Sequence, residues 1–153
     1  MNTFLPFADF QESLQVLDKK RLFKQAVEAK QLLNGSWPNH PVSKMWRGYE
    51  SALVEYYNTA LRLSVERGVN TKMQPLQAAC VVYPPWLGYP KLHASHRANL
   101  VRKAHESNSS WNRELLDNLR SKGIIDVGQL GYLWPIQHGR LLPEIEVWLK
   151  GVA

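Results

Sequence analysis

Apolar residues recur at helical spacing along most of the chain, and this pattern predicts an all-α fold. A first helix is expected at about residues 9–17, where Asp9 is the N-cap candidate. The apolar face then shifts, and Asp18 offers a second cap. We therefore expect a second helix at about 18–34, or a kinked continuation of the first, with a stop at Asn34-Gly35.

The longest run of helical spacing follows Pro41, a residue suited to the first position of a helix. Apolar residues keep this spacing up to Gly68, so we predict one long helix of about 27 residues. A short helix from Pro75 to Cys80 is expected next, followed by a turn-rich aromatic loop at 83–88.

Three further helices are expected in the second half of the chain. Pro90 begins one over 90–106, and Ser110 caps another that ends at Lys122-Gly123. Residues 128–135 read as a loop, and Pro143 opens a short last helix. No internal repeat is visible. The predicted architecture is a compact, single-domain, all-α fold with long loops, spanning the whole chain.

Composition narrows the setting of this fold. At 153 residues, 44% of them hydrophobic, the chain is long enough to bury a core. It contains no uncharged apolar run of about 18 residues, so no membrane span is expected, and its first residues do not resemble a secretory signal. A single cysteine, Cys80, cannot form an internal disulfide or a multi-cysteine zinc site. We expect a cytoplasmic protein of a bacterial or phage-infected cell, without a cofactor.

Net charge points to a polyanionic partner. Lys and Arg number 19 against 13 acidic residues, giving a formal charge of +6. Nucleic acid is the most common polyanion that such a surface meets, and phosphate contacts provide most non-specific affinity for it. A soluble protein that is merely basic is the alternative at this point.

Three polar stripes at helical spacing hold the candidate functional residues. The first lies on the second predicted helix, the second at the start of the long helix, and the third on the helix that begins at Pro90. Cations on these stripes can hold phosphates, and neighbouring cations keep a carboxylate ionised. Their members are Lys20, Arg21, Lys24, Gln25 and Glu28; His40, Lys44 and Arg47; and His93, His96, Arg97, Asn99 and Arg102.

Each stripe also has a simpler interpretation. The first and second can be solvated helix faces, with Lys24 and Glu28 forming an ordinary i,i+4 pair. His93 and His96 are spaced to bind a metal, but zinc usually needs a third ligand, which the spacing does not supply. No metal site is therefore predicted, and the histidines are interpreted as contacts to phosphate and sugar.

Four strings on and around these stripes resemble a known family. They are DKKRLFKQ at 18–25, NHPVSKMWRGYE at 39–50, LHASHRANLVRK at 92–103 and GYLWP at 131–135. They resemble small bacterial and phage proteins related to the pyrimidine-dimer DNA glycosylases of the endonuclease V type. The resemblance covers about 1–103 and 128–136, so that 104–127 is interpreted as an insertion.

The resemblance implies a compact helical fold and an activity. In the family's characterised enzyme the N-terminal α-amine attacks C1′ of the damaged nucleotide and forms a Schiff base, a glutamate assists, and β-elimination cuts the strand without a metal. An α-amine titrates at about pH 8, so it is a usable nucleophile at neutral pH. Here Asn2 is large enough to hinder removal of Met1, so the amine of Met1, or of Asn2 after processing, is the candidate nucleophile. Glu28 is the candidate carboxylate.

The prediction is a monomeric DNA-repair enzyme, an N-glycosylase with AP-lyase (endonuclease) activity on double-stranded DNA. Trp46 falls on the apolar stripe and is expected in the core, whereas Trp86 in its loop is the candidate for base stacking. A rival enzyme would act on a modified base or nucleotide, by hydrolysis for example, through a pocket of the candidate His, Lys and Glu residues. A second rival is a non-catalytic nucleic-acid-binding or host-interaction module of a phage.

Overall fold

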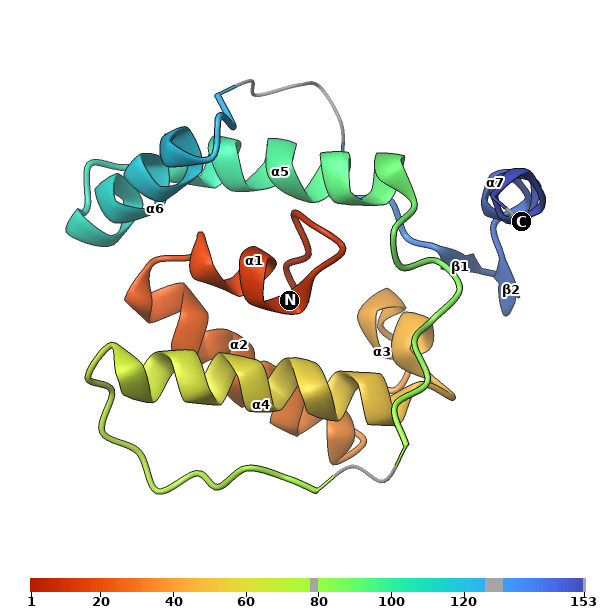
Figure 1. Cartoon of the computed structure of the whole chain (residues 1–153), viewed down its shortest axis with the longest axis horizontal. Coiled ribbons are helices and arrows are strands. Elements are labelled where there is room, and N and C mark those ends of the chain that lie inside the picture. The colour runs from red at the N-terminus through yellow and green to blue at the C-terminus, as the bar shows by residue number, and fades with distance from the viewer. Residues whose placement is uncertain (78–79, 126–130, 153) are drawn as a thin grey trace.

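The structure is a computed structural model that describes residues 1–77, 80–125 and 131–152 (Figure 1). Helices make up nearly all of its regular structure, and the all-α prediction is confirmed. They are α1 (Phe10–Gln15), α2 (Lys19–Leu33), α3 (Pro41–Trp46), α4 (Glu50–Glu66), α5 (Pro90–Ala104), α6 (Ser110–Ser121) and α7 (Pro143–Gly151). Within the described ranges the only sheet is an antiparallel pair of short strands, β1 (Ile136–Gln137) and β2 (Arg140–Leu141).

Helices α2, α4, α5 and α6 lie in two groups with the N-terminus between them (Figure 1). Helix α2 packs along α4 on one side, and α5 with α6 lies on the other (Figure 1). The first residues of the chain and α1 fill the space between these groups (Figure 1). The residues that follow Met1 are therefore buried inside the fold.

The two N-terminal helices begin where the sequence predicts. The Asp9 side chain accepts a hydrogen bond from the Glu12 amide at 2.9 Å, and Asp18 accepts one from the Arg21 amide at 3.0 Å. Both aspartates satisfy amides that a helix N-terminus leaves without an intrahelical partner. The sequence allowed either two consecutive helices or one kinked helix, and the structure has two separate helices.

The predicted long helix is wrong, because it is divided into α3 and α4. Gly48 has a φ of +86°, a conformation that favours glycine, and it separates the two helices. The Gly48 amide donates to Oε1 of Glu50 at 3.1 Å, and the Tyr49 amide donates to the Trp46 carbonyl at 2.8 Å. Apolar residues on both sides of this turn face the same core, so their spacing continues across it and hides the break.

Three smaller predictions also need correction. Residues 75–77 are not helical, and 78–79 lie outside the described residues. The cap of α6 is Ser109 and not Ser110, because the Ser109 hydroxyl accepts the Asn112 amide at 3.2 Å. The hairpin of β1 and β2 was not predicted, because two-residue strands are too short to show a pattern. The predicted loop at 128–135 is confirmed for 131–135, and its other residues lie outside the described part.

Several large aromatic side chains are buried in the core. Trp46 is buried as predicted, but Trp86 is also fully buried, so its assignment as a stacking residue is wrong. Its ring packs edge-on against Trp46, with centroids 5.1 Å apart, and its Nε1 donates to the Met45 carbonyl at 3.0 Å. No helix in the described part of the chain is long and apolar enough to cross a bilayer.

Candidate active site

The N-terminal segment is held against α2 and α4 by buried side chains. Gln25 on α2 accepts the Phe4 amide through Oε1 at 2.8 Å and donates from Nε2 to the Asn2 carbonyl at 3.1 Å. The Tyr56 hydroxyl on α4 lies 2.6 Å from the same Oε1 and 2.9 Å from the Phe4 carbonyl. Because both partners are buried, this pairing fixes the path of the chain immediately after its first residue.

Helix α5 holds the other side of the segment. The Leu5 amide donates to Nδ1 of His96 at 2.8 Å, while Nδ1 of His93 donates to the Leu5 carbonyl at 2.7 Å. Nη1 of Arg97 donates to the Pro6 carbonyl, also at 2.7 Å. Burial lowers the pKa of His93 and lowers that of His96 to about 3, so both rings are neutral at neutral pH.

These contacts change the interpretation of Gln25 on the first stripe and of three residues on the third. Gln25, His93 and His96 are buried, and their polar side-chain atoms bond to the backbone of the N-terminal segment. Asn99 is buried as well, donates to the Ser95 carbonyl at 2.7 Å and accepts Nη1 of Arg102 at 2.6 Å. We do not carry Gln25, His93, His96 and Asn99 forward as nucleic-acid contacts.

A cavity of about 300 Å³ opens at the N-terminus. Its walls combine the first residues of the chain, one face of α2, and side chains from α5, α6 and the loop before β1. The lining residues are Met1, Asn2, Phe4, Lys20, Arg21, Lys24, Gln25, Glu28, Lys103, Trp111 and Tyr132. The chain terminus and the first stripe therefore meet in one pocket with Lys103, Trp111 and Tyr132, which are distant from both in sequence.

Glu28 is the carboxylate of this pocket. Only 7% of the residue is exposed, and its Oε1 lies 3.7 Å from Nζ of Lys24, which is largely exposed. Burial raises the pKa of Glu28, while Lys24, the charge of the N-terminal amine and a hydrogen bond from the Asn2 backbone act against this rise. The N-terminal amine is thus close enough to Glu28 to influence its protonation.

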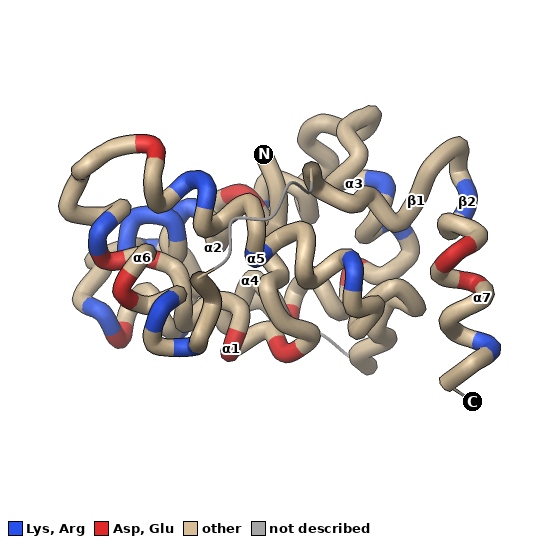
Figure 2. Tube along the Cα trace, turned by 90° about the horizontal axis from the view of Figure 1, so that it is seen from above, with Lys and Arg blue, Asp and Glu red and all other residues tan. Residues whose placement is uncertain are grey.

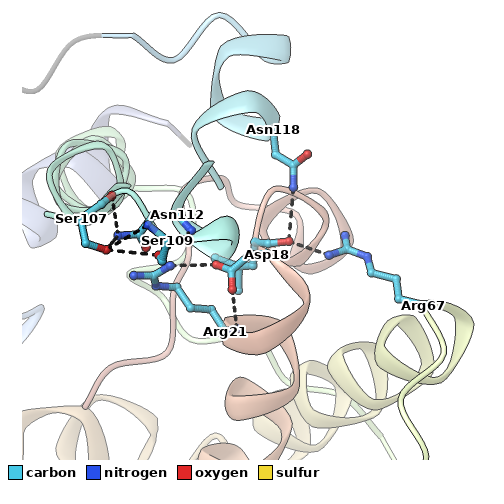
Figure 3. A network of polar contacts seen from close by, with 8 residues as sticks. Asp18, Arg21, Arg67, Ser107, Ser109, Asn112 and Asn118 are labelled. Carbon is cyan, nitrogen blue, oxygen red and sulfur yellow. Dashed lines mark hydrogen bonds and ion pairs between the residues drawn. The ribbon is translucent and has the colours of Figure 1, made fainter. Parts of the chain in front are cut away.

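Four cationic side chains line the pocket that holds this carboxylate. Three are the pocket lysines, namely Lys20, Lys24 and Lys103, and the fourth is Arg21. The buried Asp18 side chain holds Arg21 in place through Nη1 at 2.9 Å, as part of a polar network between α2, α6 and the end of α4 (Figure 3). Lys and Arg positions gather where α2, α5 and α6 approach one another (Figure 2). Such a cluster around one pocket attracts phosphate groups.

Trp111 is a pocket residue that sequence reasoning missed. It lies on α6, within the segment interpreted as an insertion, and 40% of it is exposed. Nζ of Lys20 lies 4.0 Å from the centroid of its ring, which is a cation–π contact. The spacing of Trp111 and Leu115 marks both as inward-facing, and only the tertiary structure shows that the tryptophan lines a cavity.

The second stripe stays outside the pocket. His40 caps α3 by accepting the Val42 amide at Nδ1, 3.0 Å away, and its pKa is lowered by burial and by the charge of the N-terminal amine. Lys44 and Arg47 are exposed, and Arg47 donates to the Pro38 carbonyl at 2.8 Å. Among the described residues no group of three or more His, Cys, Asp or Glu side chains is arranged to hold a metal ion.

The fold and the pocket define a helical protein whose terminus, a buried carboxylate and several cations share one cavity. Residues 1–75 match the family model described as pyrimidine dimer DNA glycosylase, and through them the chain is related to that family. The matched residues include Met1, Glu28 and most of the pocket cations, but not Lys103, Trp111 or Tyr132. No curated protein and no solved structure matches the chain significantly.

Proposed function

We propose that this protein is a DNA glycosylase with AP-lyase activity, which acts on a damaged or modified base in double-stranded DNA. The family relation supports a glycosylase type of function and a DNA substrate. The observation that carries the proposal is that the N-terminal amine and the buried Glu28 lie in one cation-lined pocket and interact electrostatically.

The chemistry follows from an amine and a carboxylate in close proximity. The unprotonated amine of Met1, or of Asn2 after processing, attacks C1′ of the target nucleotide; the glycosidic bond breaks, the base departs, and the opened sugar forms an imine with the amine nitrogen. Loss of a proton from C2′ then expels the 3′ phosphate and cuts the strand. No metal enters either step.

Glu28 serves both steps in this scheme. A carboxylate beside C1′ stabilises the positive charge that develops on the sugar as the base departs. Because burial raises its pKa toward neutrality, Glu28 is also better suited than an exposed glutamate to accept and return protons during imine formation. Lys24 and the amine limit that rise and keep the carboxylate available as a base.

The cations provide the binding surface. The pocket lysines and Arg21 contact the phosphates on either side of the target nucleotide, and Lys44, Arg47, Arg97 and Arg102 extend the basic surface along the duplex. We place this activity in the cytoplasm of a bacterial or phage-infected cell, with the protein acting as a monomer.

Borohydride trapping on abasic duplex DNA tests the proposal. Borohydride reduces an imine to a stable amine, so the expected result is a covalent protein–DNA adduct that mass spectrometry maps to the N-terminal residue. The same measurement determines whether Met1 is retained. No adduct with DNA binding retained would point to a non-catalytic binding module, and an adduct on an internal lysine would refute the N-terminal nucleophile.

A further inference from the structure

The pocket has buried polar groups that make no well-formed hydrogen bond. Neither Nδ2 nor Oδ1 of the Asn2 amide makes a hydrogen bond of good geometry, although only 4% of the residue is exposed. The Tyr132 hydroxyl also makes no hydrogen bond of good geometry, and among the described residues its only polar neighbour in the pocket to affect it by a hydrogen bond is the Asn2 side chain, which lowers its pKa. Buried donors and acceptors are nearly always paired in native proteins, so groups like these mark a place for a ligand or water.

The neighbouring His96 ring is held in one tautomer. Its Nδ1 accepts the Leu5 amide, so in the neutral ring the proton is on Nε2, which is buried without an acceptor. The His96 ring packs edge-on against the Tyr132 ring, with centroids 5.4 Å apart. Burial raises the pKa of Tyr132 to about 12, so its hydroxyl is neutral and can both donate and accept.

The arrangement of these groups indicates the chemistry of the ligand. The amide of Asn2 presents a donor and an acceptor side by side, which is the pattern that pairs with the edge of a nucleobase. Trp111 lines the same pocket with a partly exposed ring, and Nζ of Lys20 lies over that ring. A flipped base is typically bound in this way, by hydrogen bonds to its edge and stacking on an aromatic face. The volume of about 300 Å³ lies at the small end for ligand pockets.

We propose that Asn2 and Tyr132 form a subsite that binds the hydrogen-bonding edge of one unstacked nucleobase, while Trp111 stacks on its face. This inference rests on the proposed function, because it needs DNA to deliver a nucleotide to the pocket. Of the three residues, only Asn2 lies within the segment that matches the family model. The subsite is therefore an assignment that the family relation alone does not make.

A pair of matched duplexes tests the subsite. Each carries one extrahelical nucleotide, which is either a normal base or a tetrahydrofuran analogue that lacks a base, and binding is measured by fluorescence anisotropy for each of the four bases. Wild type should bind at least one base-bearing duplex more tightly than the tetrahydrofuran duplex. The loss of one hydrogen bond in Tyr132→Phe should reduce this preference about three- to tenfold, with affinity for the tetrahydrofuran duplex unchanged.

Two further variants complete the test. Asn2→Leu keeps a large residue at position 2 and removes the amide, so it should reduce the preference by a similar factor. Tyr83→Phe is the matched control, because it removes a hydroxyl that bonds to Glu55 at 2.6 Å outside the pocket. Equal melting temperatures of Tyr132→Phe and wild type would show that the fold is intact. If the two temperatures differ, the base preference of Asn2→Leu is the test of the subsite.

The outcomes separate this inference from the proposed function. Abasic DNA carries no base, so borohydride trapping by the wild-type protein does not depend on recognition of a base. Trapping with no base preference in the wild type, or with a preference that Tyr132→Phe and Asn2→Leu retain, overturns the subsite alone. A base preference that both variants lose supports the subsite, even if no adduct forms and the lyase chemistry fails.

Discussion

Replacement of Glu28 by Gln separates a catalytic carboxylate from a structural one. The amide keeps the shape of the side chain but cannot accept a proton or carry a negative charge. In the proposed chemistry Glu28 acts on the sugar and not on the phosphates, so Glu28→Gln should lose turnover and keep its affinity for DNA. If Glu28 is purely structural, Glu28→Gln should keep both its turnover and its affinity.

The loss of a catalytic acid or base and the loss of an ion pair have expected sizes that differ enough to decide between these roles. A positioned acid or base contributes about 10²- to 10⁴-fold to a rate, which corresponds to about 3 to 5 kcal/mol of barrier. The ion pair with Lys24, at 3.7 Å and with the lysine largely exposed, is worth at most about 1 kcal/mol. Loss of that pair alone therefore cannot account for a hundredfold decrease in turnover.

The assay is single-turnover cleavage of abasic duplex DNA, combined with equilibrium binding to a tetrahydrofuran duplex. The matched control is Glu66→Gln, since Glu66 also forms an i,i+4 ion pair, with Arg62 at 3.1 Å, but lies outside the pocket. Cleavage by Glu28→Gln within a small factor of the Glu66→Gln rate would refute our placement of the active site.

The same variant makes a prediction about stability and pH. Because burial raises the pKa of Glu28 above its ordinary value of 4.5, the folded state binds the proton more tightly than the unfolded state. Ionisation of Glu28 therefore reduces stability as the pH rises from 4.5 through the raised pKa, and this cost remains at neutral pH. Glu28→Gln should thus melt no lower than wild type at pH 7, and any gain should disappear below about pH 4.5.

Three further predictions concern binding, the backbone and metal. Replacement of the pocket lysines by Ala should flatten the salt dependence of duplex binding by about 0.9 per lost contact, and a slope unchanged relative to a control triple would refute their role. The control lysines, which are exposed and outside the pocket, are Lys72, Lys91 and Lys150. Gly48→Ala should cost about 1 kcal/mol or more in denaturant unfolding because of its positive φ, whereas Gly131→Ala, at ordinary φ in open space, should cost little. Excess chelator should change neither melting temperature nor trapping, and a stoichiometric metal in the purified protein would contradict this.

Periodicity and capping residues were sufficient to predict most of the fold. Asp9 and Asp18 mark the starts of α1 and α2 because their side chains bond to amides three residues ahead, which is a local interaction that sequence displays directly. The turn at Gly48 could not be found in this way. Its two flanking helices face one core with their apolar positions in phase, and a single glycine does not distinguish a turn from a tolerated helical residue.

The polar face of α5 shows why only part of the site could be predicted. His93 and His96 read as surface residues because a helix usually presents polar side chains to solvent. Their partner is the backbone of Leu5, about 90 residues earlier in the chain, whose amide and carbonyl must be satisfied where the segment is buried. No local pattern shows such a need. The same reason explains the exchange of roles between the tryptophans, with Trp86 in the core and Trp111 in the pocket.

In the proposed scheme, the reacting groups and the base-binding groups of the pocket come mostly from different parts of the chain. The amine and Glu28, which would carry the proposed reaction, lie within residues 1–75, the part that matches the family model. Trp111 and Tyr132, which would hold the base, come from α6 and from the loop before β1. Removal of a base and imine formation at C1′ are the same for any base, whereas recognition of its edge differs from one base to another. A chain can therefore keep the reacting groups and change its target through the later segments, and the preference among the four bulged bases should respond to Tyr132→Phe without a change in abasic-site trapping.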